Sequence, residues 1–585
     1  MKMMKNFRYI KDLLFKNRYR YIAGIICLLF VDFFELVLPR ILGIVTDKLK
    51  SGDMSTELLK NYALIIAVIA VLVAILRFVW RYLIFGTSKI VDRDLRERFY
   101  GHLQVLSPQY FNDHKTGDLM AHATNDLKNI EMAVGQGFAM SVDSLFIPIV
   151  ALVMMIQTAG APLTLACFAP MGLLAVVISL NSKLMYDRIN KMQAAFSDLT
   201  EKVRENISGI RVIKAFVQEK AELEEFEKIN RNNLNMNLKY AKNLQILFPL
   251  IMSISSLTTA IALLYGGLLV TQGRITLGTF ISFNSYLLLL IWPIAAIGWV
   301  TTLFQRGYVS LNRINEILEI NPDIKNALDV SKIDVINGNI EIRNLTFTYP
   351  ASSGPALTDI NINLKEGKTL AIVGRTGSGK STLANLLLRL YDTEGDNIII
   401  DGIDIKRIPL EVLRDNIGYI PQDTFLFSSK ISDNIDFYSD YSIDKIHEAA
   451  KIACVYDNIM DFPDGFDTVI GERGITLSGG QKQRLAISRA IIRNPKILIL
   501  DDCLSAVDTS TEEKILKGLR QIMNSRTSII ISHRISTIKD ADEIIVLEEG
   551  KITERGTHEE LLSFEGIYFD LYHKQLLADQ VEGVE

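Results

Sequence analysis

Residues 374–382 form a glycine-rich loop of the kind that holds phosphate groups. They follow a strand-like run at 369–373 and precede a helix-like run. The glycines let backbone N–H groups surround β- and γ-phosphate oxygens, and the N-terminus of the helix adds its dipole. Lys380 supplies a positive charge to the phosphates, and Ser381 supplies a hydroxyl to Mg²⁺. The motif therefore predicts a nucleoside triphosphate site made by Gly374, Arg375, Thr376, Gly377, Ser378, Gly379, Lys380, Ser381 and Thr382.

Two adjacent carboxylates follow the apolar run Ile497–Leu500, about 120 residues after the loop. Asp501 has the position of a Walker B carboxylate, which orients Mg²⁺ through water, and Asp502 comes directly after it. Because many apolar strands end in aspartate, this pair does not identify a site by itself. Its place downstream of a phosphate-binding loop is what gives it meaning.

A third motif lies between these two elements and reads Leu477-Ser478-Gly479-Gly480-Gln481. It resembles the signature of ATP-binding-cassette (ABC) proteins. Taken one at a time, the other matching residues are better explained as a core tyrosine, a surface glutamine or a structural histidine, but together they follow the family spacing. These matches are Tyr349, Gln422, Gly471-Glu472-Arg473-Gly474, Ser505-Ala506-Val507-Asp508 and His533.

The resemblance implies a role for each matching residue, and it implies ATP and Mg²⁺ as cofactors. Tyr349 would stack its ring on adenine, and His533 would hydrogen-bond the γ-phosphate and orient the attacking water. Gln422 would contact Mg²⁺ and report nucleotide occupancy to the membrane half. The implied catalytic residues are Asp502, His533 and Gln422, and the implied Mg²⁺ ligands are Ser381, Gln422 and Asp501.

The signature also implies a second subunit. Ser478 and Gly480 begin a helix whose N-terminus can cap a γ-phosphate, and in ABC proteins that phosphate belongs to ATP held by the opposite subunit. The residues acting on partner-bound ATP would be Leu477, Ser478, Gly479, Gly480 and Gln481. A chain with one cassette and one set of membrane spans is a half-transporter, so it must dimerise.

Asp502 stands where ATP-hydrolysing members of the family normally have a glutamate. Its side chain is one methylene shorter, which retracts the carboxylate by about 1.5 Å, and a misplacement on the order of 1 Å can slow a reaction roughly 100-fold. Bacterial heterodimeric multidrug exporters pair a subunit of this kind with one that carries the glutamate. The resemblance therefore implies a non-identical partner and slow hydrolysis at this chain's own Walker site, although His533, which some relatives lose, is retained.

Apolar runs in the first half of the chain predict six membrane-spanning helices. A span needs about 20 mostly apolar residues, and the second and fourth connections are long, polar and rich in basic residues. We expect spans two to five to continue through these connections as long helices. The positive-inside rule then places the connections, the N-terminus and the soluble half in the cytoplasm of a multi-pass plasma-membrane protein. The predicted spans are Tyr21–Val45, Tyr62–Phe85, Phe138–Gln157, Leu163–Leu180, Leu247–Thr271 and Leu277–Leu303.

The pattern changes near residue 321 to short β-branched runs that alternate with helices, which is typical of an α/β domain with a largely parallel sheet. We therefore predict an all-α, six-helix transmembrane domain of ABC exporter type at 1–320, with long intracellular loops, followed by an α/β P-loop nucleotide-binding domain at 321–585. The predicted strands are Asn339–Phe347, Thr369–Val373, Asn397–Ile400, Ile417–Ile420, Ile497–Leu500, Ser528–Ile531 and Glu543–Leu547.

Two polar regions of the membrane half resemble the intracellular loops of ABC exporters: Ser107–Phe111 with Thr116–Leu119 and Thr124–Asp126, and Ile207–Phe216. Importers of the class carry their spans on separate chains, so a fusion with the spans first favours export. The implied function is ATP-driven export of small amphipathic compounds of multidrug type. The alternatives are a lipid or lipopeptide flippase and a nucleotide-gated channel or sensor. A net charge of −4 gives no sign of nucleic-acid binding.

Several polar and aromatic residues of the membrane half have two interpretations each. Asp32 and Glu35 lie one turn apart within the first span, where ionisable groups face a cavity or a partner helix, unless they lie near a membrane edge and are solvated. Trp80, Trp292 and Trp299 either line a drug cavity or pack at the membrane interface and in the core. The sequence does not name the transported compound.

Overall fold

The computed structural model describes residues 8–327, 329–331, 333–350, 352–471, 477–504 and 509–582. The chain divides into two compact units. Unit 1 comprises Met1–Gln104 and His114–Ile320, and unit 2 comprises Val105–Asp113 and Asn321–Glu585. The fold class predicted from the sequence is confirmed, because long apolar helices come first and an α/β unit follows.

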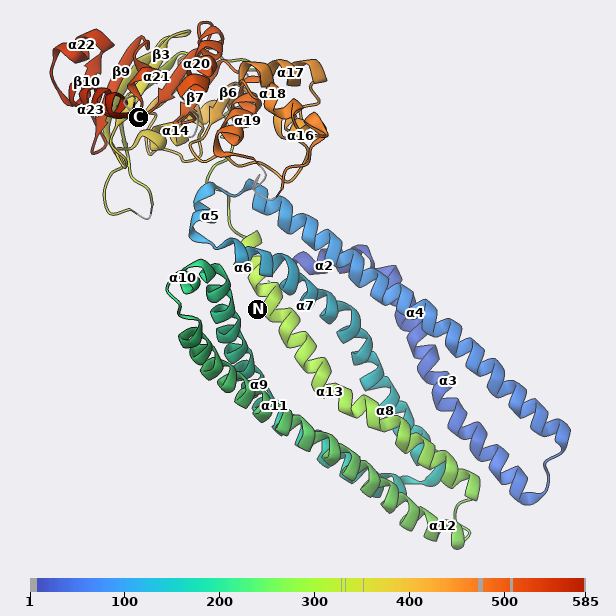
Figure 1. The fold of residues 1–585 in the computed structure, drawn as a ribbon. Coiled ribbons are helices and arrows are strands. Elements are labelled where there is room, and N and C mark those ends of the chain that lie inside the picture. The colour runs from blue at the N-terminus through green and yellow to red at the C-terminus, as the bar shows by residue number, and fades with distance from the viewer. Residues whose placement is uncertain are drawn as a thin grey trace. The chain divides into compact units, whose positions relative to one another are not determined.

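Unit 1 is made of helices, several of them very long (Figure 1). α4, α9 and α11 have 50, 48 and 43 residues, so at 1.5 Å per residue each reaches roughly 65–75 Å, twice the thickness of a bilayer core. The helices are α2 (Arg8–Lys16), α3 (Arg18–Ser51), α4 (Thr56–Val105), α6 (Thr116–Ala121), α7 (Leu127–Met132), α8 (Phe138–Ala159), α9 (Ala161–Ser208), α10 (Ile210–Ala215), α11 (Glu219–Ile261), α12 (Gly267–Thr271) and α13 (Leu277–Leu318).

Short π-helical segments join some of these helices into longer rods. They are η1 (His122–Asp126), η2 (Ala133–Gly137) and η3 (Ala262–Gly266). The third predicted span therefore continues backwards from α8 through η2, α7 and η1 to α6, while the second, fourth and fifth continue within α4, α9 and α11. The expectation that spans two to five extend as long helices is confirmed.

Five of the described helical stretches are long and apolar enough to cross a membrane. They are Arg18–Ser51, Thr56–Val105, Thr116–Ala159, Met252–Thr271 and Leu277–Leu318. The predicted fourth span, Leu163–Leu180, lies inside α9, where the shorter stretch Ala161–Pro170 is apolar. The count of six spans therefore stays a prediction. Of the three tryptophans, Trp80 is buried, whereas Trp292 and Trp299 on α13 are exposed.

A close helix crossing in unit 1 joins α3 to α13 at two glycines. A Cβ atom on Gly278 would lie 2.0 Å from the carbonyl oxygen of Gly43, and one on Gly43 would lie 2.5 Å from the carbonyl oxygen of Gly278. The Asp47 carboxylate closes the crossing, because it accepts hydrogen bonds from the backbone N–H of Gly278 at 2.7 Å and from the Thr276 hydroxyl at 2.5 Å. Only residues without a side chain fit here.

Unit 2 contains two β-sheets. The six-stranded sheet has the order β10-β9-β3-β8-β7-β6, in which all neighbours are parallel except β10, and the four-stranded antiparallel sheet has the order β2-β1-β4-β5. The strands are β1 (Ile340–Phe347), β2 (Leu357–Leu364), β3 (Thr369–Gly374), β4 (Ile398–Ile400), β5 (Ile403–Asp404), β6 (Ile417–Ile420), β7 (Ile497–Asp501), β8 (Thr527–Ile531), β9 (Glu543–Glu548) and β10 (Lys551–Gly556).

All seven predicted strands are present, and β2, β5 and β10 were missed. The larger sheet is buried on both faces, because alternate residues of β3 enter two different apolar cores: Ala371 and Val373 in one, Leu370 and Ile372 in the other. This two-sided burial is what continuous apolar strands indicate. The prediction of a largely parallel sheet is confirmed for this larger sheet, and the smaller antiparallel sheet is an addition to it.

Helices of unit 2 cover the sheets. Between β3 and β9 they are α14 (Lys380–Leu387), α15 (Leu410–Asp415), α16 (Ile431–Asp436), α17 (Ile443–Ile452), α18 (Tyr456–Met460), α19 (Gly479–Ile491), α20 (Thr509–Met523) and α21 (Ile535–Ile538). After β10 come α22 (His558–Ser563) and α23 (Ile567–Glu582). α5 (Pro108–Asp113) also belongs here: the Asn112 amide donates to the Tyr391 hydroxyl at 3.2 Å, and the Ser107 hydroxyl donates to Asp323 at 2.8 Å.

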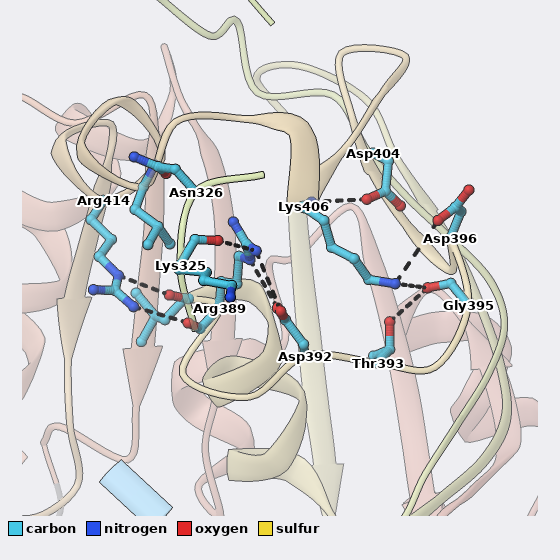
Figure 2. Close-up of polar contacts among 12 residues, drawn as sticks. Lys325, Asn326, Arg389, Asp392, Thr393, Gly395, Asp396, Asp404, Lys406 and Arg414 are labelled. Atoms are coloured by element: carbon cyan, nitrogen blue, oxygen red, sulfur yellow. Dashed lines mark hydrogen bonds and ion pairs between the residues drawn. The ribbon is translucent and has the colours of Figure 1, made fainter. Parts of the chain in front are cut away.

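An arginine holds the first residues of unit 2, which follow α13, against the rest of that unit (Figure 2). Arg389 is 3 % exposed, and its Nη2 donates to the carbonyl oxygen of Lys325 at 3.0 Å while its Nε donates to Asp392 at 2.8 Å. Arg414 in turn donates to the carbonyl oxygen of Arg389 at 2.9 Å. Burial and the neighbouring Arg389 charge lower the pKa of Arg414. These bonds fix the start of unit 2 against the end of α14.

The glycine crossing yields a stability prediction. Gly278→Ala should lower the unfolding free energy by about 1–3 kcal/mol, because the added methyl group overlaps backbone atoms that side-chain rotation cannot move. The matched control is Gly267→Ala, since a Cβ there has no neighbour within 4 Å. Thermal unfolding of the purified protein in nanodiscs measures both. Equal midpoints for the two variants would contradict the prediction.

Candidate functional site

The candidate site residues come together because of strand direction. β3, β8, β7 and β6 are neighbouring parallel strands, so their carboxyl ends share one edge of the sheet. The loop at 374–382 follows β3, Asp501 ends β7, and Gln422 and His533 follow β6 and β8. Segments far apart in the sequence are thereby gathered at one place.

The loop at 374–382 is built around its lysine. Lys380 is 7 % exposed, and its Nζ donates to the carbonyl oxygens of Gly374 at 2.9 Å and Arg375 at 2.8 Å. Burial lowers the pKa of Lys380, and the charges of Asp501 and Asp502 oppose that shift. The cation is therefore held under the loop, at the N-terminal end of α14, where a phosphate would gain both the charge and the helix dipole.

Two glycines of this loop are required by space. A Cβ on Gly374 would lie 2.2 Å from the carbonyl oxygen of Leu547 on the neighbouring strand β9. Gly379, at φ +99°, starts α14 in the left-handed region, and a Cβ there would lie 2.6 Å from the carbonyl oxygen of Ala356. The loop can follow this path only with glycine at both positions.

Asp501 lies at the centre of the site and is 3 % exposed. Burial raises the pKa of Asp501; the hydrogen bond from Ser381 opposes this shift, the charge of Asp502 adds to it, and the charges of Lys380 and His533 oppose it. Tyr419 on β6 also hydrogen-bonds Asp501, and burial raises the pKa of Tyr419. The sequence reasoning missed Tyr419, because a strand tyrosine carries no motif.

Asp502 faces the same group of charges. Its carboxylate interacts electrostatically with both Lys380 and Asp501. Its backbone has φ +44°, and its N–H donates to the carbonyl oxygen of Ile531 at 2.8 Å. Aspartate tolerates this left-handed conformation better than most residues. The turn that follows β7 is thus anchored to β8, and the Asp502 side chain extends into the site from a fixed backbone.

His533 and Gln422 have exposed side chains at the same sheet edge. The charge of His533 acts on Asp501, and the carbonyl oxygen of His533 accepts a hydrogen bond from Gln575 of α23. Gln422 follows directly after the strand β6 and Pro421. No side-chain contact among the described residues tests the role of either one, so both roles stay predictions.

Tyr349 lies beside the end of the phosphate loop. Its hydroxyl donates to the Thr382 hydroxyl at 3.1 Å, and its ring makes edge contacts with Phe347 and Tyr391 at 5.0 and 5.1 Å between centroids. The ring is half-buried, so one part of it remains open to solvent. Stacking on adenine remains the predicted role.

The signature begins α19 with a capping box. The Ser478 hydroxyl accepts from the Gln481 backbone N–H at 3.2 Å, and the Gln481 side chain accepts from the Ser478 N–H at 2.9 Å. Because the Ser478 oxygen is used as an acceptor, its hydrogen stays available to donate, and the side chain is exposed. Leu477 is buried and anchors this turn. The matches Glu472-Arg473-Gly474 and Ser505–Asp508 lie outside the described residues.

The chemistry of these residues fits a magnesium–nucleotide complex. Ser378 is 4 % exposed, and its hydroxyl has no hydrogen-bond partner among the described residues, so a phosphate oxygen would satisfy it. Ser381 and Asp501 provide the hydroxyl and carboxylate oxygens that Mg²⁺ prefers. Lys380, the loop N–H groups and the N-terminus of α14 supply the matching positive potential for phosphates.

Comparison with known proteins gives matches over most of the chain. A family described as ABC transporter transmembrane region matches residues 21–294, and one described as ABC transporter matches residues 357–505. The chain is 38 % identical over 565 residues to the probable multidrug resistance ABC transporter ATP-binding/permease protein YheI of Bacillus subtilis (strain 168), which covers 96 % of each chain.

Two further proteins are similar over nearly the full length. The ATP-dependent lipid A-core flippase of Syntrophus aciditrophicus (strain SB) is 34 % identical over 530 residues, covering 90 % of this chain and 88 % of that one. A solved structure of a bacterial Atm1-family ABC exporter with ATP bound superimposes with a TM-score of 0.81 at 27 % identity, covering 95 % of this chain and 98 % of that one.

The phosphate loop yields a second prediction. Gly374→Ala should abolish nucleotide binding and lower the unfolding free energy by about 1–3 kcal/mol, because the methyl group overlaps the Leu547 carbonyl oxygen. The control is Gly354→Ala, where a Cβ has no neighbour within 4 Å. Titration with a fluorescent ATP analogue and thermal unfolding measure the two effects. Wild-type affinity in Gly374→Ala would contradict the loop geometry.

Proposed function

Because this chain belongs to the ABC transporter family, we propose that it is one subunit of a heterodimeric exporter that moves amphipathic compounds of multidrug type out of the cytoplasm. In this proposal its own Walker site binds ATP but hydrolyses it slowly. The residue that carries the proposal is Asp502, which follows the Walker B aspartate Asp501. The relative YheI, described as a probable multidrug resistance transporter, supports the substrate class.

A half-transporter works as a dimer, and exposed apolar surface on both units supports this. On unit 2, neighbouring aromatic rings follow Gln422, with Phe425 and Phe427 55 % and 42 % exposed. On unit 1, the turn between α9 and α11 exposes Phe216 and Val217, at 70 % and 78 %. Apolar groups in such number at loop ends mark protein interfaces, and a second chain would cover them.

The length of Asp502 determines which site hydrolyses. Its carboxylate shares the charge network of Lys380 and Asp501, so it retains the chemistry of a base. It ends about 1.5 Å short of where a glutamate would reach, and in-line attack on a phosphate needs a positioned base or a water-orienting group. Hydrolysis at this site is therefore slow and not absent, with His533 retained to orient water.

The two nucleotide sites of the proposed heterodimer differ. Site one uses Lys380, Asp501 and Asp502 of this chain with the partner's signature, and it mainly holds ATP. Site two uses the partner's Walker motifs, including its glutamate, with Ser478 and Gly480 of this chain. The outward-facing Ser478 hydroxyl and the start of α19 are the groups that this chain offers to the partner's ATP. Most hydrolysis takes place at site two.

The proposed transport cycle follows from this division. ATP at both sites closes the two cassettes, the long helices move with them, and the cavity between the spans opens outward; hydrolysis at site two resets the cycle. The proposal keeps the predicted domains at 1–320 and 321–585. It places the N-terminus and the nucleotide-binding domain in the cytoplasm and the helices in the plasma membrane, in line with the basic residues of the long connections.

Lipid flipping is the second candidate function. Its support is the similarity to the ATP-dependent lipid A-core flippase, which reaches 34 % identity. A lipid is itself an amphipathic compound, so the same fold and the same ATP chemistry would serve. The two functions differ in the transported molecule, and transport assays with dyes and with labelled lipids separate them.

The asymmetric scheme predicts unequal effects of two substitutions in the assembled pair. Ser478→Ala should abolish more ATPase activity than Lys380→Ala, because it removes a donor from the site that hydrolyses. The measurement is phosphate release by the purified heterodimer. Ser478→Ala also removes a helix cap, which costs about 1 kcal/mol, so Thr557→Ala, which removes the similar capping box of α22, is the control. Equal losses would count against asymmetry.

The length of the carboxylate predicts a gain of function. Asp502→Glu should raise ATP turnover of a homodimeric preparation of this chain by roughly 100-fold, since the longer side chain reaches the attacking water. Asp502→Asn, which keeps the length and removes the charge, should lower it further. Steady-state phosphate release measures both. If Asp502→Glu gives no gain, the partner supplies nothing that this carboxylate lacks.

A further inference from the structure

Four ionisable residues gather among three apolar helices of unit 1. Asp32 and Glu35 lie on α3, Arg77 lies on α4 and Asp143 lies on α8. Electrostatic interactions link Asp32 to Asp143, Glu35 and Arg77, and link Asp143 to Glu35 and Arg77. We call Asp32, Glu35, Asp143 and Arg77 the acidic cluster. It contains three carboxyl groups and one guanidinium group.

One carboxylate of the cluster has its own counterion. Arg77 forms an ion pair with Glu35. Asp32 is 3 % exposed, and its Oδ2 has no hydrogen-bond partner among the described residues; the same holds for the buried Oδ1 of Asp143. Arg77 is the one basic group that acts electrostatically on these two aspartates within the described chain. Because Arg77 is paired with Glu35, Asp32 and Asp143 have no basic partner of their own among the described residues.

Other polar atoms at the same level are also left without partners. Asp32 lies about one helical turn before Glu35, and Trp80 lies about one turn after Arg77. Because α3 and α4 run in opposite directions, both residues are on the same side of the Glu35–Arg77 pair. Trp80 is 8 % exposed, and its Nε1 has no hydrogen-bond acceptor among the described residues. The hydroxyl of Ser144, beside Asp143, is likewise buried without a partner. A buried polar atom in this state indicates a group that arrives from outside.

The cluster lies deep in the predicted membrane region. Asp32 is eleven residues into the span that starts at Tyr21, or about 16 Å at 1.5 Å per residue, near the middle of a hydrocarbon core of about 30 Å. Its burial excludes the interpretation that Asp32 is solvated at a membrane edge. Carboxyl groups at this depth face a cavity or a ligand pathway and mark functional positions.

We propose that the acidic cluster is a substrate site that binds the charged group of an amphipathic organic cation, with Asp32 and Asp143 as its counterions. The inference rests on the proposed export function and names its substrate class. Arg77 is held by Glu35, which leaves the two aspartates available. A positively charged ligand would give these carboxyl groups a counterion, and the unpaired Trp80 and Ser144 would bind its polar atoms.

The surroundings favour an organic cation over a metal ion. Leu28, Val31, Ile69 and Val73 form a buried apolar core together with Trp80. Ca²⁺ and Mg²⁺ take six or more oxygen ligands, whereas an organic cation places its charge against the carboxylates and its hydrocarbon part against apolar side chains. The carboxyl groups and the apolar core together would therefore contact both the charged part and the hydrocarbon part of such a molecule.

The test measures dye binding to the exporter, assembled with its partner chain in nanodiscs. Ethidium is the cationic probe, and Nile red is an uncharged amphipathic probe. Asp32→Asn and Asp143→Asn should each weaken ethidium binding by about tenfold and leave Nile red binding within about threefold, because only the cation loses its counterion. Asp32→Glu, which keeps the charge, should bind both dyes nearly as the wild type does. Asp53→Asn, in the exposed connection after α3, is the control.

Other outcomes overturn the inference in distinguishable ways. Equal weakening for both dyes would mean that the aspartates only support packing. Ethidium binding that is unchanged in both variants, or that falls equally in Asp53→Asn, would remove the cluster from recognition. Loss of assembly with the partner in Asp32→Asn would mean that a partner side chain is the counterion. In these cases wild-type export of Nile red would keep the proposed function intact, whereas a wild type that binds and exports neither dye would contradict that function itself.

Discussion

The chemistry of unit 2 depends on one structural constraint, the parallel direction of β6, β7, β8 and β3. Parallel neighbours place their carboxyl ends at one edge, and Lys380, Asp501, Asp502 and His533 all lie at or just beyond such ends. Burial and charge then fix the side chains at that edge. The lysine is held by loop carbonyl oxygens, and its charge faces two adjacent carboxylates. The site is thus prepared for a polyphosphate before any ligand arrives.

Much of this arrangement was predictable from the sequence, and the failures have physical reasons. Apolar strands such as β3 and β7 were found because two-sided burial leaves a continuous apolar run. β2 was missed because Asp and Asn separate its apolar residues, and β10 was missed because Ile552 is its single apolar residue; Asp, Asn, Lys and Glu are depleted in strands. The P-loop carried its own motif, whereas Tyr419 became visible only when β6 was paired with β7.

In the membrane half, the contacts between distant residues were even harder to predict from the sequence. Apolar length alone predicted the helices, because a membrane span must satisfy its backbone hydrogen bonds internally. Asp32 and Glu35 stood out as charges in an apolar run. Their connection to Arg77 and Asp143 could not be read from spacing, since those residues lie more than 40 and more than 100 positions away. Only the packing of α3, α4 and α8 brings the four groups together.

Both units contain polar groups that a ligand or a partner chain can hydrogen-bond or pair with. In unit 2, the Ser478 hydroxyl keeps a free hydrogen and the Ser378 hydroxyl is buried without a partner among the described residues. In unit 1, one carboxyl oxygen of Asp32 and one of Asp143 are buried without a hydrogen-bond partner in the part of the chain that the structure describes. Each missing interaction is unfavourable in the isolated chain, so each molecule that supplies one gains binding free energy there. A ligand shifts a conformational equilibrium only by its differential affinity for the two states. A polar group that has a partner in one state and lacks it in the other creates such a difference in affinity. Groups of this kind can therefore link the binding of ATP, partner and substrate in one cycle.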